Sequence, residues 1–270
     1  MSAFKNYLFK QFRKRLAGKK SFQRLFNLTK ILSLEGLNYG NGGSIEISGE
    51  LSLLQKLNKE YVENRAYIVF DAGANQGDYC SALIENIQIK DLQIWCFEPS
   101  KDTFKKLQLS HANTPNVFLN NIGFSNKDEE IPLYTNEPGS LVASLYPLER
   151  PTGLSAKLSD FEMVSIKTID GFLAEKNIPY IDLLKLDIEG NELNALMGAN
   201  DALNSGKIKA IQFEFGTCNI DSRTFFRDFW NLLSPKYRLY RLVKDGLQPI
   251  TSYIEYEEVF ATINYYAELK

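Results

Sequence analysis

The chain contains 270 residues, of which 44% are hydrophobic and 13% aromatic. These proportions predict a folded protein with a sizeable core and exclude an intrinsically disordered chain. The net charge of −2 hides an asymmetry: residues 1–34 contain nine Lys or Arg and no acidic residue, whereas the remainder carries 22 basic and 33 acidic residues. A basic arm on a body of net charge −11 indicates an anionic partner for the arm, either a membrane surface or an anionic substrate.

The cysteines and the apolar runs set the expected compartment. Three cysteines without CxxC spacing argue against a disulfide framework and a structural zinc site. No apolar stretch approaches the roughly 20 residues that span a bilayer, and the N-terminus lacks the apolar core of a signal peptide. We therefore predict a cytoplasmic protein, with attachment to the inner face of a membrane as an additional hypothesis.

Residues 1–65 are predicted to form a helical, basic N-terminal extension. Phe4, Leu8, Phe12 and Leu16 recur at intervals of four, which indicates an amphipathic helix over residues 1–32. Its apolar stripe could lie on an anionic membrane or pack on the domain, and packing on the domain is the favoured interpretation. The loop NYGNGG (38–43) and a further helical pattern follow.

Residues 66–270 are predicted to form one α/β domain. Its apolar runs suit parallel strands buried on both faces, and helical patterns alternate with them. The five runs are 67–70, 93–97, 116–119, 181–186 and 208–213. A doubly wound, mostly parallel sheet is therefore expected, with extra short strands (IPLYT, SLVASL, MVSIKTI) between 124 and 168. An antiparallel pair at 238–243 and 257–264 should close the sheet.

Four of the five parallel runs end at a carboxylate: Asp71, Glu98, Asp187 and Glu214. Ligands of open parallel sheets bind outside the carboxyl ends of the strands. Four acids crowded on one edge would repel one another without a cationic or hydroxyl-rich ligand. The sheet edge is therefore the predicted binding site.

The first strand is followed by the turn DAGANQGD (71–78), whose glycines have GxxxG spacing, not the GxGxxG spacing of dinucleotide sites. We expect the glycines to allow close approach of a ligand. Acids on both sides of the turn disfavour a pyrophosphate, whereas S-adenosylmethionine carries a cationic sulfonium and an amino group. Glu98 occupies the position from which an acid accepts hydrogen bonds from ribose hydroxyls, and Ser100 is the expected N-cap of the next helix.

The segment KLDIEGNE (185–192) follows the fourth run. If the strand continues, alternation places Lys185, Asp187 and Glu189 on one side. The alternative is that Lys185 and Asp187 form a buried ion pair that only organises the sheet.

Together these motifs resemble the FkbM family of S-adenosylmethionine-dependent methyltransferases, across roughly residues 66–220. The matching segments are FDAGANQGDYC (70–80), FEPS (97–100), NNIGFSN (120–126), TIDGFL (168–173), LLKLDIEGNELNALMGA (183–199) and IQFEFG (211–216). The resemblance implies a class I methyltransferase fold, a Rossmann-like doubly wound sheet. It also implies that the acceptor pocket uses the N-terminal fifty residues, the C-terminal fifty and the 124–165 insertion.

The resemblance implies roles for individual residues. Asp71, Gly73, Asn75 and Gly77 would line the methionine end of the cofactor, and Glu98 would hold the ribose. Asn121 or Ser100 would lie near the adenine, and Asp187 and Glu189 would face the transferring methyl group. The remaining residues assigned to the cofactor are Ala74, Tyr79 and Pro99.

The resemblance implies methylation of an acceptor hydroxyl, on a saccharide or on a glycan or natural-product intermediate. The base is predicted to be Asp187 or Glu189 first and Glu214 second, because we interpret the single histidine, His111, as a surface residue. A metal site is not assigned, although three carboxylates could instead hold Mg²⁺.

Three alternatives remain open: a peptide or amine acceptor, a non-catalytic binding module that has kept the fold, and a nicotinamide oxidoreductase, which the loop acids disfavour. No nucleic-acid partner is predicted, and the oligomeric state is not assigned.

Overall fold

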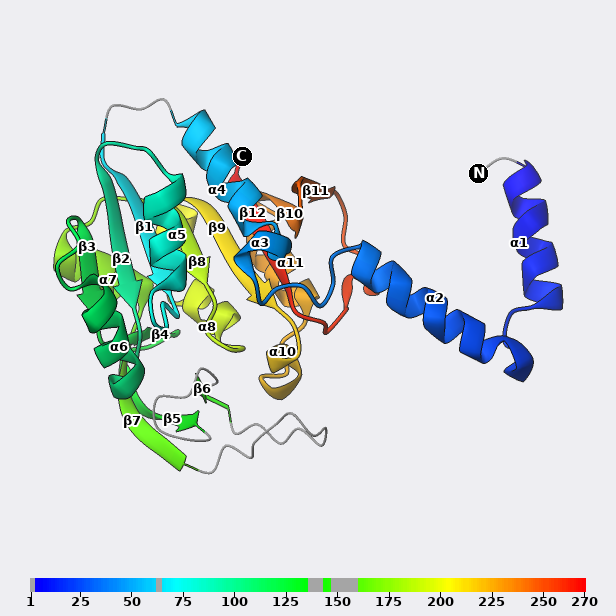
Figure 1. Ribbon diagram of the computed structural model, residues 1–270, viewed down its shortest axis with the longest axis horizontal. Helices are drawn as coiled ribbons and strands as arrows, with labels where there is room; N and C mark the ends of the chain where they lie inside the picture. The colour runs from blue at the N-terminus through cyan, green and yellow to red at the C-terminus, as the bar shows by residue number, and fades with distance from the viewer. Residues whose placement is uncertain (1–2, 62–64, 136–142, 147–159) are drawn as a thin grey trace.

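A computed structural model describes residues 3–61, 65–135, 143–146 and 160–270 (Figure 1). Within these residues the main sheet has eight strands in the order β11-β10-β12-β9-β8-β1-β2-β3. Strands β3, β2, β1, β8 and β9 are parallel, and β12, β10 and β11 continue the sheet in antiparallel pairing. The bounds are β1 (Tyr67–Ala72), β2 (Leu92–Phe97), β3 (Val117–Asn120), β8 (Ile181–Leu186), β9 (Ile208–Phe215), β10 (Tyr237–Val243), β11 (Gly246–Ile250) and β12 (Ile263–Leu269). The predicted doubly wound, mostly parallel sheet is confirmed.

Helices cover both faces of this sheet and make three layers. One face carries α4 (Glu50–Glu60), α5 (Asp78–Asn86) and α6 (Lys101–His111), whose apolar side chains join one core cluster. The other face carries α7 (Ile169–Lys176), α8 (Glu192–Met197), α9 (Asn200–Asn204) and α11 (Phe226–Leu233). Strand β1 is buried along its whole length and sends alternate side chains into the two clusters, which explains its continuous apolar run.

The C-terminal part of the sheet differs from the prediction. The second strand of the antiparallel pair is β12, and it begins at Ile263, whereas residues 255–257 form a short 3-10 helix, η2 (Glu255–Glu257). An additional strand, β11, pairs with β10 through a two-residue turn. This strand was missed because it lies at the edge of the sheet, where Pro249 and exposed polar residues are tolerated and no apolar alternation is needed.

A second, four-stranded sheet in the order β4-β7-β5-β6 fills the interval between β3 and α7. Its described strands are β4 (Gly123–Phe124), β5 (Glu129–Thr135), β6 (Ala143–Ser144) and β7 (Asp160–Lys167). The runs IPLYT and MVSIKTI predicted two of them. Part of the run SLVASL lies outside the described residues, and its Ala143 and Ser144 form β6.

The N-terminal extension contains more breaks than predicted. Helix α1 (Ala3–Arg15) ends before Gly18, whose φ of 74° interrupts the helix, and η1 (Lys20–Phe22) and α2 (Gln23–Gly36) follow. The single helix expected over residues 1–32 is therefore wrong. Packing of its stripe on the domain is also wrong, because Leu8 and Phe12 are 50% and 40% exposed.

The second half of the extension is part of the core. A short helix, α3 (Ile45–Ser48), leads into α4, and Leu53, Leu54 and Leu57 of α4 are buried against the sheet. Helix α10 (Cys218–Asp221) follows β9 in the chain. Among the described helices, none combines the length and the hydropathy that crossing a membrane requires.

Candidate active site

The predicted strand-end acids occupy the same edge of the sheet. Asp71 lies inside β1 and is fully buried, Glu98 follows β2 directly, and Asp187 follows β8. The Asp187 backbone N–H donates to the Ala72 carbonyl at 3.0 Å, which ties the ends of β8 and β1 together. Glu214 differs slightly from the prediction, because it lies within β9 and not beyond its end.

The glycine turn and Glu98 form one hydrogen-bonded unit. The Glu98 carboxylate accepts the Asn75 N–H at 3.1 Å and the Ser100 N–H at 2.9 Å. Asn75 can direct its N–H there because its φ is 50°, a left-handed conformation that asparagine tolerates. Burial raises the pKa of Glu98 to about 7, although the two backbone N–H donors lower it.

Contacts within the protein explain why two positions of the turn are glycine, and the sequence did not indicate these contacts. A Cβ atom on Gly73 would lie 1.8 Å from the Asp187 carbonyl oxygen, so the close approach it allows is to the protein's own β8 turn. A Cβ atom on Gly77 would lie 2.4 Å from the ring of His111. These contacts with backbone and imidazole already require glycine at both positions, and close approach of a ligand to the turn stays a prediction.

His111 is not a surface residue, so that interpretation was wrong. It ends α6 and is only 7% exposed, with Nε2 at 3.1 Å from the Gly77 carbonyl oxygen and 3.2 Å from Ser81 Oγ. The fold places the last residue of α6 against the start of α5. His111 therefore packs against the glycine turn and lines neither of the cavities described below.

Lys185 is the centre of a buried charge cluster. Its Nζ lies 3.1 Å from Asp187 Oδ2, 3.7 Å from Asp71 Oδ1 and 4.8 Å from the ring centroid of Tyr79. The ion pair that the sequence left open is therefore present. Burial lowers the pKa of Lys185, but Asp187, Asp71 and Glu50 together raise it above its usual value. Asp187 is 39% exposed at its side chain, so it faces solvent as well as Lys185.

Glu50 brings the N-terminal extension into this cluster. Its carboxylate accepts Gln212 Nε2 at 2.6 Å and Ser48 Oγ at 2.9 Å, and Gln212 Oε1 accepts the Tyr79 hydroxyl at 2.9 Å. Burial raises the pKa of Glu50, and the charge of Lys185 partly opposes that shift. Sequence reasoning missed Glu50 because nothing local distinguishes it from any acid at the start of a helix.

A turn after β8 places Glu189 at the site, and strand alternation does not. Strand β8 ends at Leu186, and Glu189 has a φ of 54° in the following turn. Its Oε2 accepts the Cys218 thiol at 2.6 Å. The neighbouring Glu192 shapes this turn, because its Oε1 accepts the N–H groups of Ile188 and Gly190 at 3.0 and 3.1 Å. Burial raises the pKa of Glu192 to about 7.

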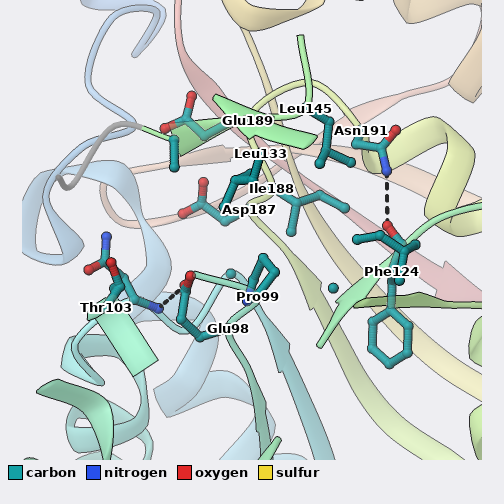
Figure 2. A pocket seen from close by; sticks show the side chains of 15 residues that line it. Glu98, Pro99, Thr103, Phe124, Leu133, Leu145, Asp187, Ile188, Glu189 and Asn191 are labelled. Atoms are coloured by element: carbon teal, nitrogen blue, oxygen red, sulfur yellow. Dashed lines mark hydrogen bonds between the residues drawn. The ribbon is translucent and has the colours of Figure 1, made fainter. Parts of the chain in front are cut away.

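Two neighbouring cavities open at this edge of the sheet. The first lies between the strand ends and the small sheet, and Figure 2 shows Glu98, Asp187 and Glu189 among the side chains that line it. Leu133 of β5 and Ile166 of β7 supply part of its apolar surface. Its lining consists of Gly73, Asn75, Glu98, Pro99, Thr103, Gly123, Phe124, Leu133, Ala143, Leu145, Ile166, Asp187, Ile188, Glu189 and Asn191.

The second cavity lies between the glycine turn and the N-terminal extension. It is lined by Gly42, Gly43, Ser44, Ile45, Glu46, Glu50, Gly73, Ala74, Asn75, Asp78, Tyr79, Lys185 and Asp187. Gly73, Asn75 and Asp187 belong to both linings, so the two cavities meet at these residues.

The predicted site residues divide between the cavity walls and the layer behind them. Residues that line a cavity are Gly73, Ala74, Asn75, Tyr79, Glu98, Pro99, Asp187 and Glu189. Residues outside both linings are Asp71, Gly77, Ser100, Asn121 and Glu214. Asn121, for example, donates through Nδ2 to the carbonyls of Glu98 and Pro99 at 2.9 Å each, so it fixes the backbone that carries the wall. Ser100 occupies the N-cap position of α6 without a side-chain hydrogen bond to the helix.

Glu214 lines neither cavity, although its carboxylate lies next to Gly42 of the second lining. Burial raises its pKa well above the usual value, and the charges of Asp187 and Glu189 raise it further. Both causes favour the neutral form of the Glu214 carboxyl group over its ionised form.

The site residues missed by sequence reasoning belong to the small sheet and to residues 42–50. The first group had a signal, because the runs IPLYT and MVSIKTI were expected to be strands and the insertion was expected to shape the acceptor pocket. The second group had only the loop NYGNGG, which gave no indication of its position next to the glycine turn.

A buried polar atom bears on the kind of ligand that fits. Asn75 Oδ1 is buried and has no hydrogen-bond partner among the described residues, although Asn75 lines both cavities. It can accept from a donor such as an amino or hydroxyl group. Around Lys185 stand three carboxylates, those of Asp71, Asp187 and Glu50, so the neighbourhood favours a cationic group over a phosphate.

The chain is similar in sequence to known proteins. The chain is 25% identical over 174 residues to the hexuronic acid methyltransferase AglP of Haloferax volcanii, a match covering 63% of this chain and 65% of that protein. It is 28% identical over 149 residues to Methyltransferase 1 of Beauveria bassiana, covering 49% of this chain and 58% of that protein. The matches thus span less than two thirds of either relative.

A solved structure and a family model agree with these relatives. The crystal structure of a methyltransferase FkbM from Methylobacillus flagellatus KT superposes with a TM-score of 0.51 at 18% identity, over 96% of this chain and 57% of that one, which supports the fold. The sequence model of the methyltransferase FkbM domain matches residues 71–242, from the glycine turn to β10. The chain therefore belongs to the FkbM methyltransferase family.

Proposed function

We propose that this domain transfers a methyl group from S-adenosylmethionine to a hydroxyl group of a saccharide-type acceptor. The observation that carries the proposal is the junction of the two cavities at Gly73, Asn75 and Asp187. A donor in the first cavity and an acceptor entering from the second would meet beside one partly exposed carboxylate, as a transfer reaction requires.

The first cavity suits an adenosyl group. Glu98 would hold the ribose hydroxyls and Pro99 would lie beside them, while the apolar side chains of Leu133 and Ile166 offer a surface for a base. Asn75 Oδ1, which has no hydrogen-bond partner in the part of the chain that the structure describes, would accept from the amino group of the methionine part. The bound cofactor supplies a methyl group already activated on a sulfonium, so the protein's task is to align the partners and to accept a proton.

Asp187 is the proposed base. Lys185 Nζ donates to Asp187 Oδ2 at 3.1 Å, which orients the carboxylate and leaves it partly exposed at the junction. The acceptor hydroxyl would lose its proton to this carboxylate. Glu189 lines only the first cavity and already accepts the Cys218 thiol, so it ranks second. Glu214 ranks last because it lines neither cavity.

The charge of the second cavity suggests the class of acceptor. Glu46, Glu50, Asp78 and Asp187 are in its lining, and Lys185 is the only basic residue that the described chain contributes there. The Haloferax relative is named for a hexuronic acid, which carries a carboxylate. We infer that this chain instead takes a neutral sugar. An amino sugar or another amine is the second candidate, because the same acids would attract a cation.

Metal chemistry has no part in the proposed steps. Within the described residues, His, Cys, Asp and Glu side chains do not gather in threes as they would to hold a metal ion. Methyl transfer measured with and without EDTA tests Mg²⁺ dependence directly.

The test combines binding with turnover. We expect S-adenosylhomocysteine to bind in a calorimetric titration, and we expect Asp187→Asn to retain that binding within about tenfold while methyl transfer falls at least about 100-fold. Glu189→Gln serves as the matched variant and should lose less activity. Absence of binding to the wild-type protein, or near-normal turnover in both folded variants, would contradict the proposal.

A further inference from the structure

The N-terminal arm, defined here as residues 5–37, exposes several large apolar side chains to solvent. Helices α1 and α2 stand away from the sheet in Figure 1. On α2, Leu25, Leu28 and Leu32 are 53%, 54% and 58% exposed. Single exposed apolar residues are common on proteins, but several on one short helix indicate a contact surface.

The exposed leucines lie on one side of α2. Their spacing of three and four residues places Leu25, Leu28 and Leu32 along the same stripe of the helix. The aromatic residues of the arm are used differently, because the rings of Phe12 and Phe22 both pack near Phe26, with centroids 5.6 and 6.4 Å away. The arm thus has a small cluster at its bend and an apolar stripe that is left to solvent.

The charge of the arm indicates which kind of partner covers its apolar stripe. Residues 5–37 carry nine Lys or Arg and one acidic residue, Glu35. The arm of a second copy would be repelled by this charge, and a nucleic acid would have no use for a stripe of leucines. Basic and apolar side chains on the same helices fit a surface with anionic headgroups above a hydrocarbon interior.

We propose that α1 and α2 lie on an anionic membrane surface. Leu25, Leu28 and Leu32 insert among the acyl chains, and the basic side chains of the arm, such as Arg13 and Lys14, contact the headgroups. The arm is interfacial and does not cross the bilayer.

The arm is connected directly to the candidate site. Tyr39, just after the arm, is buried, and the Gly40 N–H donates to the Thr262 carbonyl at 2.9 Å, so the base of the arm is fixed to the domain. Gly42, Gly43 and Ser44 then line the second cavity. Attachment of the arm therefore holds the second cavity near the membrane surface, where an acceptor carried on a lipid would be presented.

The test is flotation of the full chain with vesicles of phosphatidylcholine alone and of phosphatidylcholine mixed with phosphatidylglycerol. We expect binding to the anionic vesicles only, and we expect salt to weaken it. Combined replacement Lys10→Gln, Arg13→Gln and Lys14→Gln should weaken binding about 100-fold, because each basic residue at such a surface contributes about fivefold. Combined replacement Leu25→Gln, Leu28→Gln and Leu32→Gln should weaken it at least about tenfold.

Matched controls lie on the domain. Leu109→Gln removes an 89% exposed leucine of α6, and the triple replacement Lys90→Gln, Lys127→Gln and Lys209→Gln removes three exposed charges outside the arm. Neither control should change flotation. Two results would overturn the proposal: no flotation of the folded wild-type protein with anionic vesicles at low salt, or a dimer in light scattering that the leucine variant converts to monomer while vesicle binding is unchanged.

Discussion

The two walls of the candidate site are built in different ways. One wall consists of the ends of β1, β2 and β8 with their turns, where each residue is held by backbone hydrogen bonds and by close contact, as Gly73 is by the Asp187 carbonyl. The other wall consists of residues 42–50, most of which line the second cavity. There Gly43 has open space around its Cα, and Glu46 is exposed.

This difference indicates that the two walls have different functions. The strand-end wall tolerates little change, because its turns fit against one another at backbone distance, and we assign it to the cofactor that all transfers would share. The other wall has exposed positions, such as Gly43 and Glu46, whose side chains can change without disturbing the sheet, so it is suited to distinguish acceptors. Substitutions on the two walls should therefore differ in both size and kind of effect.

The largest expected effect is that of Gly73→Ala. The added Cβ would lie 1.8 Å from the Asp187 carbonyl oxygen, and Gly73 has a φ of 81°, which a residue with a side chain adopts only with strain. We expect a loss of about 3 kcal/mol or more in the free energy of unfolding, measured in urea, together with loss of S-adenosylhomocysteine binding.

The matched control is Gly43→Ala on the other wall, where no atom lies within 4 Å of the added Cβ. Its free energy of unfolding should stay within about 0.5 kcal/mol of the wild-type value. Equal stability of the two variants would remove the distinction between the walls.

A smaller effect is expected from the protonation of Glu98. Burial raises its pKa to about 7 from 4.5, so folding favours the neutral form. That contribution to stability is fully present below the unfolded-state pKa and is lost as the pH rises through about 7. Acceptance of two ribose hydroxyls requires the ionised form. The affinity for S-adenosylhomocysteine should thus fall about tenfold for each pH unit below about 7.

Calorimetry on both sides of pH 7 measures this slope. Glu98→Gln should bind more weakly and lose the pH dependence, whereas Asp102→Asn, which removes a half-exposed acid of α6, should keep it. A slope that persists unchanged in Glu98→Gln would assign the titration to another group.

The same contrast explains what the sequence could predict. The strand-end wall is encoded in contiguous segments: apolar runs give the five parallel strands, and the acid after each run gives Asp71, Glu98 and Asp187. The other wall depends on contacts between distant segments, such as Glu50 with Gln212, which no local pattern records. His111 was misplaced for that reason, since only the tertiary fold brings α6 onto Gly77.

Glu189 shows a further limit. Its position was expected from strand alternation, yet it depends on a turn that Glu192 stabilises through two backbone N–H groups. The arm shows the opposite case, because its pattern was recognised but its environment was not. Amphipathic spacing identifies a helix with an apolar side without telling whether protein or another phase covers that side.

The smallest expected effect concerns the charge of the acceptor wall. Glu46 lines the second cavity, is exposed, and accepts a hydrogen bond from Ser44 Oγ that lowers its pKa, so it is ionised at neutral pH. Its charge should disfavour a uronic acid relative to the matching neutral sugar. We expect Glu46→Gln to raise relative binding of glucuronic acid over methyl glucoside about twofold to fivefold, because an exposed charge is strongly screened. Saturation-transfer NMR with S-adenosylhomocysteine present measures the ratio, and Glu130→Gln, an exposed acid of β5, should leave it unchanged. Preference for the uronic acid in the wild-type protein would show that the acids of this wall do not select the acceptor.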